Sequence, residues 1–392
     1  MSANNKSGNV KRWIRNIHLW LGLTSGLFVC FLGITGCILA FEREIEDLTQ
    51  EYRFVQPKKQ AYLQPSRLKA IADPLVPGKQ AHSVSYQQGK ASQVVYYGFE
   101  PEYYWIVFID PYTGKVLKVK NMEEDFFHIM IDGHYYLWLP PNVGQPVLAS
   151  ATLMFLFLLI SGLVLWWPKN RAASKKRFTI KWNAKWKRVN YDLHNVLGFY
   201  MTWILIFIAF SGLVMGFQWF AKSSYWVSTG GKSLVQFEES VSDTTVAATL
   251  PAGTPAMDIL WARTIDSLKN TRMGMEVHVP ATAHAAIELT LNPDTDTYWK
   301  TDYRYYDQYS LKEIPVEHVY GKFSEAGAGD KLMRMNYDIH VGAIAGIAGK
   351  IMAFLASLIA ASLPITGFLI WRGKQKKSRE KRVEKSLVQA LK

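Results

Sequence analysis

Residues 190–220 read NYDLHNVLGFYMTWILIFIAFSGLVMGFQWF, and the part from Val196 to Phe220 contains no Asp, Glu, Lys or Arg. An apolar run needs about 20 residues to cross the hydrocarbon core of a bilayer as a helix. Backbone groups in lipid must bond to one another, so such a run is helical. This stretch therefore predicts a membrane-spanning helix that begins just after a histidine, His194.

Three further runs have the same character. Leu19–Phe41 and Val147–Trp167 contain no charged residue, and Val341–Trp371 contains only Lys350. Each is long enough to span a bilayer. The sequence therefore predicts a membrane all-α bundle of four main transmembrane helices, with two long polar segments between them.

The placement of basic residues gives these helices a predicted orientation. Residues 1–17 carry four Lys or Arg and no acid, 168–190 carries nine and no acid, and the tail after Trp371 carries nine against two Glu. Because Lys and Arg concentrate on the cytoplasmic side of membrane helices, these segments are predicted to be cytoplasmic. A nucleic-acid role for the basic patches is disfavoured, because each patch adjoins a membrane helix.

These patterns divide the chain into eight predicted parts. In chain order they are a cytoplasmic N-terminus with helix 1 (1–42), a first outer domain (43–135), helix 2 (136–168), a basic cytoplasmic loop (169–190), helix 3 (191–220), a second outer domain (221–335), helix 4 (336–371) and a basic cytoplasmic tail (372–392).

Each outer domain is predicted to be a small α+β domain. YYWIVFIDPYTGKVLKV at 103–119 has two β-rich runs around a turn that starts at Asp110, and IELTLNPDTDTYWKTD at 287–302 has a similar strand–turn–strand pattern around Asn292. Helices are expected before both, at 65–75 and 257–270. Asp110 and Asn292 are expected to cap turns and to do no chemistry.

Helices 1 and 3 share a pattern that begins at a histidine. His18 starts HLWLG and His194 starts HNVLG. Eighteen residues after each histidine comes a glycine, Gly36 or Gly212, with Thr or Ser directly before it. Helices 1 and 3 are therefore predicted to be two copies of one unit.

Helices 2 and 4 correspond in the same way. SGLVLW at 161–166 matches TGFLIW at 366–371. Upstream of these motifs, His134 lies 28 residues before the first glycine and His340 lies 27 before the second. The chain is thus predicted to duplicate a helix–outer domain–helix unit, with one histidine of each kind in each copy.

Four histidines in register predict two haem sites. His18 and His194 begin helices that leave the cytoplasmic side, and His134 and His340 precede helices that enter from outside. Two imidazoles on facing helices make a six-coordinate haem iron suited to electron transfer. The alternative is that the histidines are structural residues at the membrane boundary. The spacing alone does not separate haem from another imidazole-bound metal, although few carboxylates or thiols lie nearby for zinc or copper.

Basic residues near these histidines are candidate partners for haem propionates. Arg12, Arg15 and Arg188 lie near the first pair, and Lys350 lies near the second. Their alternative roles are topology signal, headgroup contact and, for Lys350, snorkelling from a helix end. Along an uninterrupted helix, His340 would lie about 15 Å beyond Lys350, so the outer centre is expected at or beyond the lipid surface.

Motifs in the turn and helices resemble a known family. Three features are similar to the PepSY-associated transmembrane family of iron-regulated inner-membrane proteins: the turn IDPYTGKV at 109–116, the Ser/Thr-Gly pair near the end of each membrane helix, and LWWPK at 165–169. This family includes siderophore reductases of the ferrioxamine-utilisation type. The similarity runs over nearly the whole chain, although Asn292-Pro293 departs from the family's Asp-Pro turn.

The resemblance implies a bacterial inner-membrane protein with cytoplasmic termini, two periplasmic PepSY-like domains and two haem b groups. It implies His18 and His194 as ligands of a cytoplasmic-side haem and His134 and His340 as ligands of a periplasmic-side haem, with His128 as a less favoured alternative to His134. It further implies reduction of Fe(III) in a periplasmic ferric siderophore, with electrons from a separate cytoplasmic or membrane donor.

Other function classes have weaker sequence support. The chain has no nucleophile–base set, no phosphate-binding glycine loop and no flavin or nicotinamide fingerprint. The competing hypothesis is a non-redox, membrane-anchored binding or regulatory protein in which the histidines are structural. A siderophore permease component is a weaker third hypothesis, because four main helices with few buried charges offer little path for a substrate.

Overall fold

The protein is described by a computed structural model that covers residues 3–99, 102–168, 177–245, 250–251, 253–268 and 270–390. Part of the predicted basic loop, 169–176, lies outside these residues. The chain divides into two compact units. The helical unit contains residues 1–40, 130–218 and 339–392, and the sheet unit contains residues 41–129 and 219–338.

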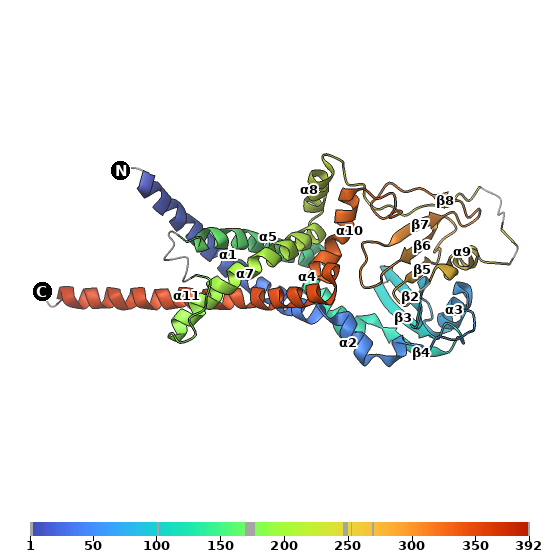
Figure 1. The fold of residues 1–392 in the computed structure, drawn as a ribbon, viewed down its shortest axis with the longest axis horizontal. Helices are drawn as coiled ribbons and strands as arrows, with labels where there is room; N and C mark the ends of the chain where they lie inside the picture. Colours follow the sequence, from blue (N-terminus) through green and yellow to red (C-terminus); the bar gives the residue numbers. More distant parts are fainter. Residues whose placement is uncertain are drawn as a thin grey trace. The chain divides into compact units, whose positions relative to one another are not determined.

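Four long helices build the helical unit (Figure 1): α1 (Ala3–Leu39), α5 (Pro141–Trp166), α7 (Trp186–Gly216) and α11 (Gly346–Ala390). Each contains a segment long and apolar enough to cross a membrane, which confirms the four predicted spans. Helix α1 packs against α5 and α11, and α7 packs against the same two helices. Helices α1 and α7 therefore occupy opposite corners of the bundle, as do α5 and α11.

Small residues let the helices approach closely at one crossing. A Cβ added to Gly33 on α1 would lie 2.6 Å from the carbonyl oxygen of Ser357 on α11 and 2.9 Å from the Cβ of Ala361. Only glycine fits a contact this close, as in other membrane helix pairs. Farther along the bundle, Leu159, Leu205 and Ala356 belong to its apolar core.

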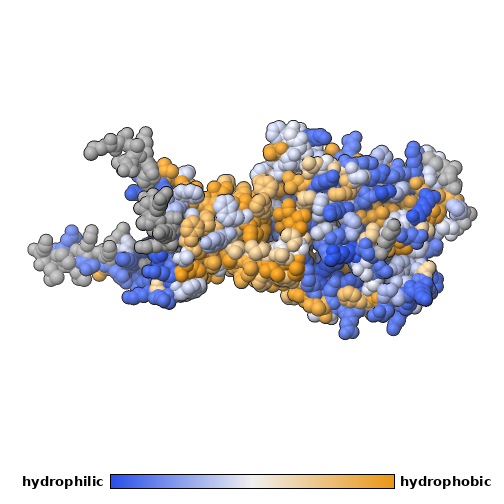
Figure 2. Space-filling view, in the orientation of Figure 1, coloured by the Kyte–Doolittle hydropathy of each residue, from blue (hydrophilic) through white to orange (hydrophobic). Residues whose placement is uncertain are grey.

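The outward faces of the four helices are apolar. Figure 2 shows hydrophobic residues covering this unit, and Leu27 on α1 and Phe207 on α7 are 78% and 64% exposed. Several exposed tryptophans of this unit lie near the ends of the apolar segments, as expected for residues at a membrane–water interface: Trp13, Trp138, Trp167 and Trp186. The surface thus suits lipid around the middle of the helices.

A short helix precedes each of two membrane helices. Helix α4 (Phe126–Tyr136) leads to α5, and α10 (Ala328–His340) leads to α11. The chain turns sharply after each, with φ of 56° at Trp138 and 78° at Gly342. The expectation that His340 rises along one helix with Lys350 is therefore wrong, because a turn and the 3-10 helix Ala343–Ala345 separate α10 from α11.

The sheet unit contains one antiparallel sheet in the order β4-β3-β2-β1-β5-β6-β7-β8. Its strands are β1 (Ala81–Gln87), β2 (Ser92–Phe99), β3 (Glu102–Ile109), β4 (Val116–Asn121), β5 (Gly274–His278), β6 (Ile287–Asn292), β7 (Asp302–Tyr306) and β8 (Glu313–Ile314). The two outer segments, predicted as separate domains, therefore form a single unit. They join where β1 pairs with β5, with Val84 opposite Val277.

Helices complete the sheet unit: α2 (Glu42–Thr49), α3 (Pro65–Ala72), α8 (Gln218–Thr229) and α9 (Ala256–Thr264). Helices α3 and α9 fall within the predicted helical stretches. Both contribute to the main apolar core of the unit, where Leu68 and Leu260 pack with Val84, Val277 and Leu289 of the strands. Among the described residues, each chain segment thus supplies one of these two core helices and four consecutive strands.

The turn of the second segment that corresponds to the Asp110 turn is not the predicted one at Asn292. Asp110 Oδ1 accepts the N–H groups of Tyr112 and Thr113 between β3 and β4. Between β7 and β8, Asp307 Oδ1 accepts the N–H groups of Tyr309 and Ser310 in the same way. The Asn292 segment instead begins a longer β6–β7 connection. Leu311 replaces glycine in the second turn, with a φ of 56°, which hid the correspondence in the sequence.

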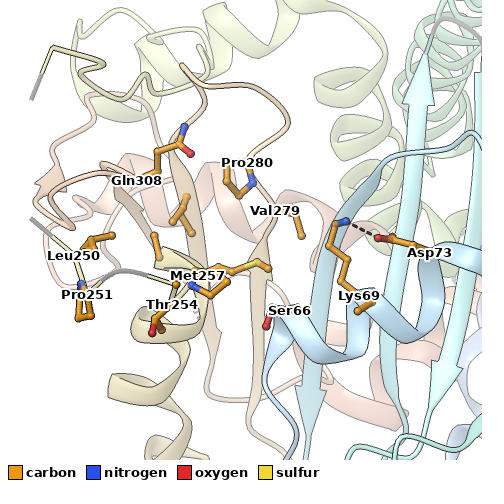
Figure 3. A pocket seen from close by; sticks show the side chains of 15 residues that line it. Ser66, Lys69, Asp73, Leu250, Pro251, Thr254, Met257, Val279, Pro280 and Gln308 are labelled. Carbon is orange, nitrogen blue, oxygen red and sulfur yellow. Dashed lines mark hydrogen bonds and ion pairs between the residues drawn. The ribbon is translucent and has the colours of Figure 1, made fainter. Parts of the chain in front are cut away.

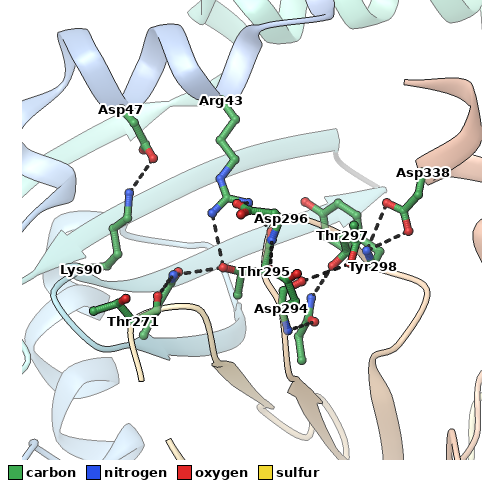
Figure 4. Close-up of polar contacts among 12 residues, drawn as sticks. Arg43, Asp47, Lys90, Thr271, Asp294, Thr295, Asp296, Thr297, Tyr298 and Asp338 are labelled. Carbon is green, nitrogen blue, oxygen red and sulfur yellow. Dashed lines mark hydrogen bonds and ion pairs between the residues drawn. The ribbon is translucent and has the colours of Figure 1, made fainter. Parts of the chain in front are cut away.

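A polar network joins the two segments of the sheet unit (Figure 4). Arg43 on α2 donates to the Thr295 carbonyl and forms an ion pair with Asp296 at 3.0 Å. Asp338 at 0% exposure accepts backbone N–H groups of Tyr298 and Trp299. These contacts hold the β6–β7 connection against residues from both segments.

Candidate histidine sites

The structure brings the four predicted histidines together as two pairs. Pair A is His18 on α1 and His194 on α7, whose partners Ser161 and Thr366 lie at corresponding positions of α5 and α11. Pair B is His134 on α4 and His340 on α10, whose ring centroids are 6.2 Å apart with an interplanar angle of 68°. In each pair, one histidine comes from each half of the chain.

Every one of these histidines has a hydroxyl partner at Nδ1. In pair A, His18 contacts Ser161 Oγ at 2.8 Å and His194 contacts Thr366 Oγ1 at 2.9 Å. In pair B, the contacts are His134 to Thr35 Oγ1 at 2.7 Å and His340 to Ser211 Oγ at 3.0 Å. Each partner is the Ser or Thr of a Ser/Thr-Gly motif, so the four motifs serve the four histidines one to one.

The glycine of each motif lies beside the same imidazole ring. A Cβ would lie 3.5 Å from His18 Cε1 if added at Gly162, and 3.2 Å from His194 Cε1 if added at Gly367. At Gly36 and Gly212 the distances to the pair B rings are 3.7 and 3.2 Å. The missing side chain therefore lets each ring lie close to the helix that supplies its hydroxyl.

The two pairs lie at opposite ends of the bundle. On α1, 17 residues separate His18 of pair A from Thr35, which contacts pair B, and on α7 the same number separates His194 from Ser211. At 1.5 Å per residue this is about 25 Å along each helix. Because this spacing is the same on α1 and α7, the two histidines of each pair lie at the same height along the bundle.

The geometry of pair B fits two imidazoles that share one metal. A metal–imidazole bond of about 2 Å on each side puts facing ring centroids about 6 Å apart, which matches the observed 6.2 Å. Among the described residues, no group of three or more His, Cys, Asp or Glu is placed to hold a metal ion. Two imidazoles are also the donor set that holds haem iron in many electron-transfer proteins.

Two buried polar atoms near pair A have no partner within the described part of the chain. They are Oδ1 of Asn190, one turn before His194, and Nε1 of Trp166, one turn after Gly162. Asn190 Nδ2 meanwhile donates to the Thr366 carbonyl at 3.1 Å. Because buried polar groups rarely stay unbonded, these atoms favour a bound polar group or water there.

The other predicted residues lie in varied surroundings. Arg12 and Arg15 are exposed on α1, on the N-terminal side of His18. Lys350 is half-buried in the first turns of α11, at the end of the bundle that holds pair B. His128 lies in the sheet unit against the ring of Tyr104, with centroids 5.3 Å apart. The structure therefore places His134, and not His128, beside His340.

One buried carboxylate near pair A was not predicted. Asp192 is 3% exposed and accepts a hydrogen bond from Arg188 Nε at 2.9 Å. Arg188, which the sequence also places near pair A, is thereby held by Asp192. A charge inside the start of an apolar helix, two residues before a histidine, was the available sequence signal.

A separate cavity of about 630 Å³ lies wholly in the sheet unit (Figure 3). Ser66 and Lys69 of α3 and Met257 of α9 line it, together with Gln308, and Lys69 pairs with Asp73 at 2.7 Å. None of the four histidines lines it.

Fold and site together define a class: an integral membrane protein with a four-helix bundle, two internal histidine pairs and one α+β unit inserted in two segments. The chain matches the profile of the PepSY-associated TM region over residues 15–374 and belongs to that family. No protein with curated annotation matches it.

Proposed function

We propose that this protein is an inner-membrane dihaem b reductase that passes electrons from the cytoplasmic side to a periplasmic ferric siderophore. Pair A would hold one haem and pair B the other. The electron donor would be a separate cytoplasmic or membrane protein. The siderophore part rests on the resemblance of the helix motifs to the ferrioxamine-utilisation type within the family.

The observation that carries the proposal is the facing of His134 and His340. Their rings belong to opposite halves of the chain, lie 6.2 Å apart and are each bonded at Nδ1 by a hydroxyl. A structural role would not require a histidine of one half to lie against the ring of its counterpart in the other half. Two imidazoles presented through Nε2 meet the requirement of a six-coordinate haem.

The residues of the bundle would bind and orient the cofactors and keep water away. Bound haem supplies reversible one-electron chemistry. The apolar core around Leu205 separates the two pairs and excludes water from the bundle. One electron converts the siderophore's Fe(III) to Fe(II), and hard oxygen ligands hold Fe(II) less tightly, so iron is released.

The proposed orientation follows from charge. The basic residues of 1–17, of 168–190 and after Trp371 would face the cytoplasm, so both termini would be cytoplasmic. The sheet unit, inserted between α1 and α5 and between α7 and α11, would then be periplasmic. Arg12, Arg15 and Lys350 remain candidate partners for haem propionates.

The test is the visible spectrum of the detergent-purified protein before and after dithionite. We expect a Soret band, a sharp reduced α band and two haems per chain. Absence of these bands would contradict the dihaem proposal and favour the non-redox binding or regulatory alternative.

A second measurement tests the substrate. Dithionite-reduced protein, freed of reductant, is mixed with a ferric hydroxamate siderophore in the presence of a colour-forming Fe(II) chelator. We expect reoxidation with one Fe(II) formed per electron. A haem-containing protein that stays reduced would point to another acceptor.

A further inference from the structure

We propose that the four Ser/Thr hydroxyls of the Ser/Thr-Gly motifs are positioning residues that fix the tautomer of the four histidines. Thr35, Ser161, Ser211 and Thr366 would each hold one imidazole with its proton on Nδ1 and its lone pair on Nε2. This inference rests on the proposed function, because it treats the four histidines as haem ligands.

A hydroxyl group has a single hydrogen to donate. Thr366 Oγ1 lies 2.9 Å from the Ser362 carbonyl oxygen, and Thr35 Oγ1 lies 2.9 Å from that of Phe31. A carbonyl oxygen can only accept, so the hydroxyl hydrogen is donated there. The hydroxyl oxygen then has only lone pairs left for the histidine.

Ser211 and Ser161 repeat this arrangement. Ser211 Oγ lies 2.8 Å from the Phe207 carbonyl oxygen, and Ser161 Oγ lies 3.2 Å from that of Leu158. All four hydroxyls are therefore donors to their own helix and acceptors toward the imidazole. With the hydroxyl hydrogens donated to the helix, each neutral imidazole would carry its proton on Nδ1, which leaves Nε2 without one.

His340 gives an independent indication. Its Nδ1 also lies 3.0 Å from the backbone carbonyl oxygen of Ile208. Since that oxygen cannot donate, Nδ1 carries the proton whatever the hydroxyl of Ser211 does. Metal-bound histidines commonly have their other nitrogen held by such an outer partner, which orients the ring and raises its basicity.

These four hydroxyls differ from other buried Ser and Thr hydroxyls of the bundle in contacting a histidine, and not in bonding to their own helix. Thr202 on α7 is also buried and donates to the Gly198 carbonyl at 2.6 Å, with no histidine beside it. Such bonds are ordinary for Ser and Thr in membrane helices. Thr202 therefore provides a matched control.

The experiment compares Thr366→Val, Thr366→Ser and Thr202→Val with the wild type. We expect Thr366→Val to weaken retention of the pair A haem by roughly 10- to 100-fold, the usual effect of removing an outer partner, and to shift its midpoint potential. Thr366→Ser should restore both properties. Thr202→Val should leave both haems unchanged.

A second readout needs no haem. In haem-free protein labelled with ¹⁵N-histidine, we expect the wild type to show His194 as the Nδ1–H tautomer and Thr366→Val to lose that preference. If the wild type contains no haem, the proposed function fails while this readout still tests the tautomer. Unchanged haem retention and tautomer in Thr366→Val, or equal losses in Thr202→Val, would overturn the inference.

Discussion

The helical unit and the sheet unit are each assembled from separated stretches of the chain, but the stretches join in different ways. In the sheet unit, Ser83–Gln87 of β1 pairs with Gly274–His278 of β5, and the backbone itself closes the joint. In the helical unit, each histidine is bonded within its own half, and the two halves present imidazoles to each other. The backbone joint is complete in itself. The two halves of the bundle meet by helix packing, α1 against α11 and α5 against α7, and the facing histidines would add a joint only with a shared ligand between them.

The largest expected effect tests the histidine joint directly. We expect His194→Ala and His340→Ala each to lower the haem content from two to one per chain, and the double variant to contain none, because each substitution would remove one of the two side chains proposed to hold that haem. The measurement is the haem-to-protein ratio. His128→Ala is the control and should keep both haems, and a loss there with none in His340→Ala would overturn the assignment of pair B.

Removal of haem should lower the stability of the helical unit and leave the stability of the sheet unit unchanged. A ligand present at about 1,000 times its Kd stabilises the folded protein by about 4 kcal/mol, and only the helical unit would lose this in protein made without haem. We expect faster hydrogen exchange around Leu205 of α7 and unchanged exchange at Val84 and Val277. Equal acceleration in both units would mean that their stabilities do not differ in this way.

The glycines offer a smaller and graded effect within pair A. A Cβ at Gly367 would lie 3.2 Å from His194 Cε1, while at Gly162 it would lie 3.5 Å from His18 Cε1. We expect Gly367→Ala to cost about 1–3 kcal/mol as an overpacked contact, seen as faster loss of haem to an acceptor protein. Gly162→Ala serves as the control and should be close to neutral. Greater loss in Gly162→Ala would contradict the arrangement of the rings.

The smallest expected effect concerns the sheet unit and pH. Burial, with repulsion from Glu276, raises the pKa of Glu288 to about 7 from 4.5. A raised pKa means that the folded state is favoured while Glu288 is protonated, so stability declines as pH rises from about 4.5 to about 7. After allowance for partial exposure, the loss is about 1–2 kcal/mol.

Glu288→Gln should therefore melt at a higher temperature than the wild type at pH 8 and at the same temperature at pH 4.5. Thermal unfolding followed by sheet-unit fluorescence measures this. Glu123→Gln, at an exposed position, is the control. A constant difference across the pH range would show that packing, and not ionisation, accounts for the change.

Much of the helical unit could be predicted because its signals are local. Long uncharged runs defined the four helices, and repeated spacing around His18 and His194 selected the histidines. The sharp turn at Gly342 was not predicted, because the apolar run continues through the turn. The buried position of Asp192 was not predicted, because its partner Arg188 was assigned to the basic loop.

The sheet unit was predicted element by element but not as a whole. The β3–β4 turn and helices α3 and α9 have local signatures. Pairing of β1 with β5 depends on segments about 190 residues apart, and no local pattern specifies it. The turn at Asp307 escaped because Leu311 stands where glycine is expected.

The sequence by itself determined which residues enter the membrane and which histidines correspond, because hydrophobic length and fixed spacing are properties of the chain. Only the tertiary structure decided that the halves share one sheet, that His134 and His340 face each other, and that each Ser/Thr-Gly motif holds a histidine from a neighbouring helix. Those outcomes depend on which helices become neighbours, and that is set by packing between residues far apart in the chain.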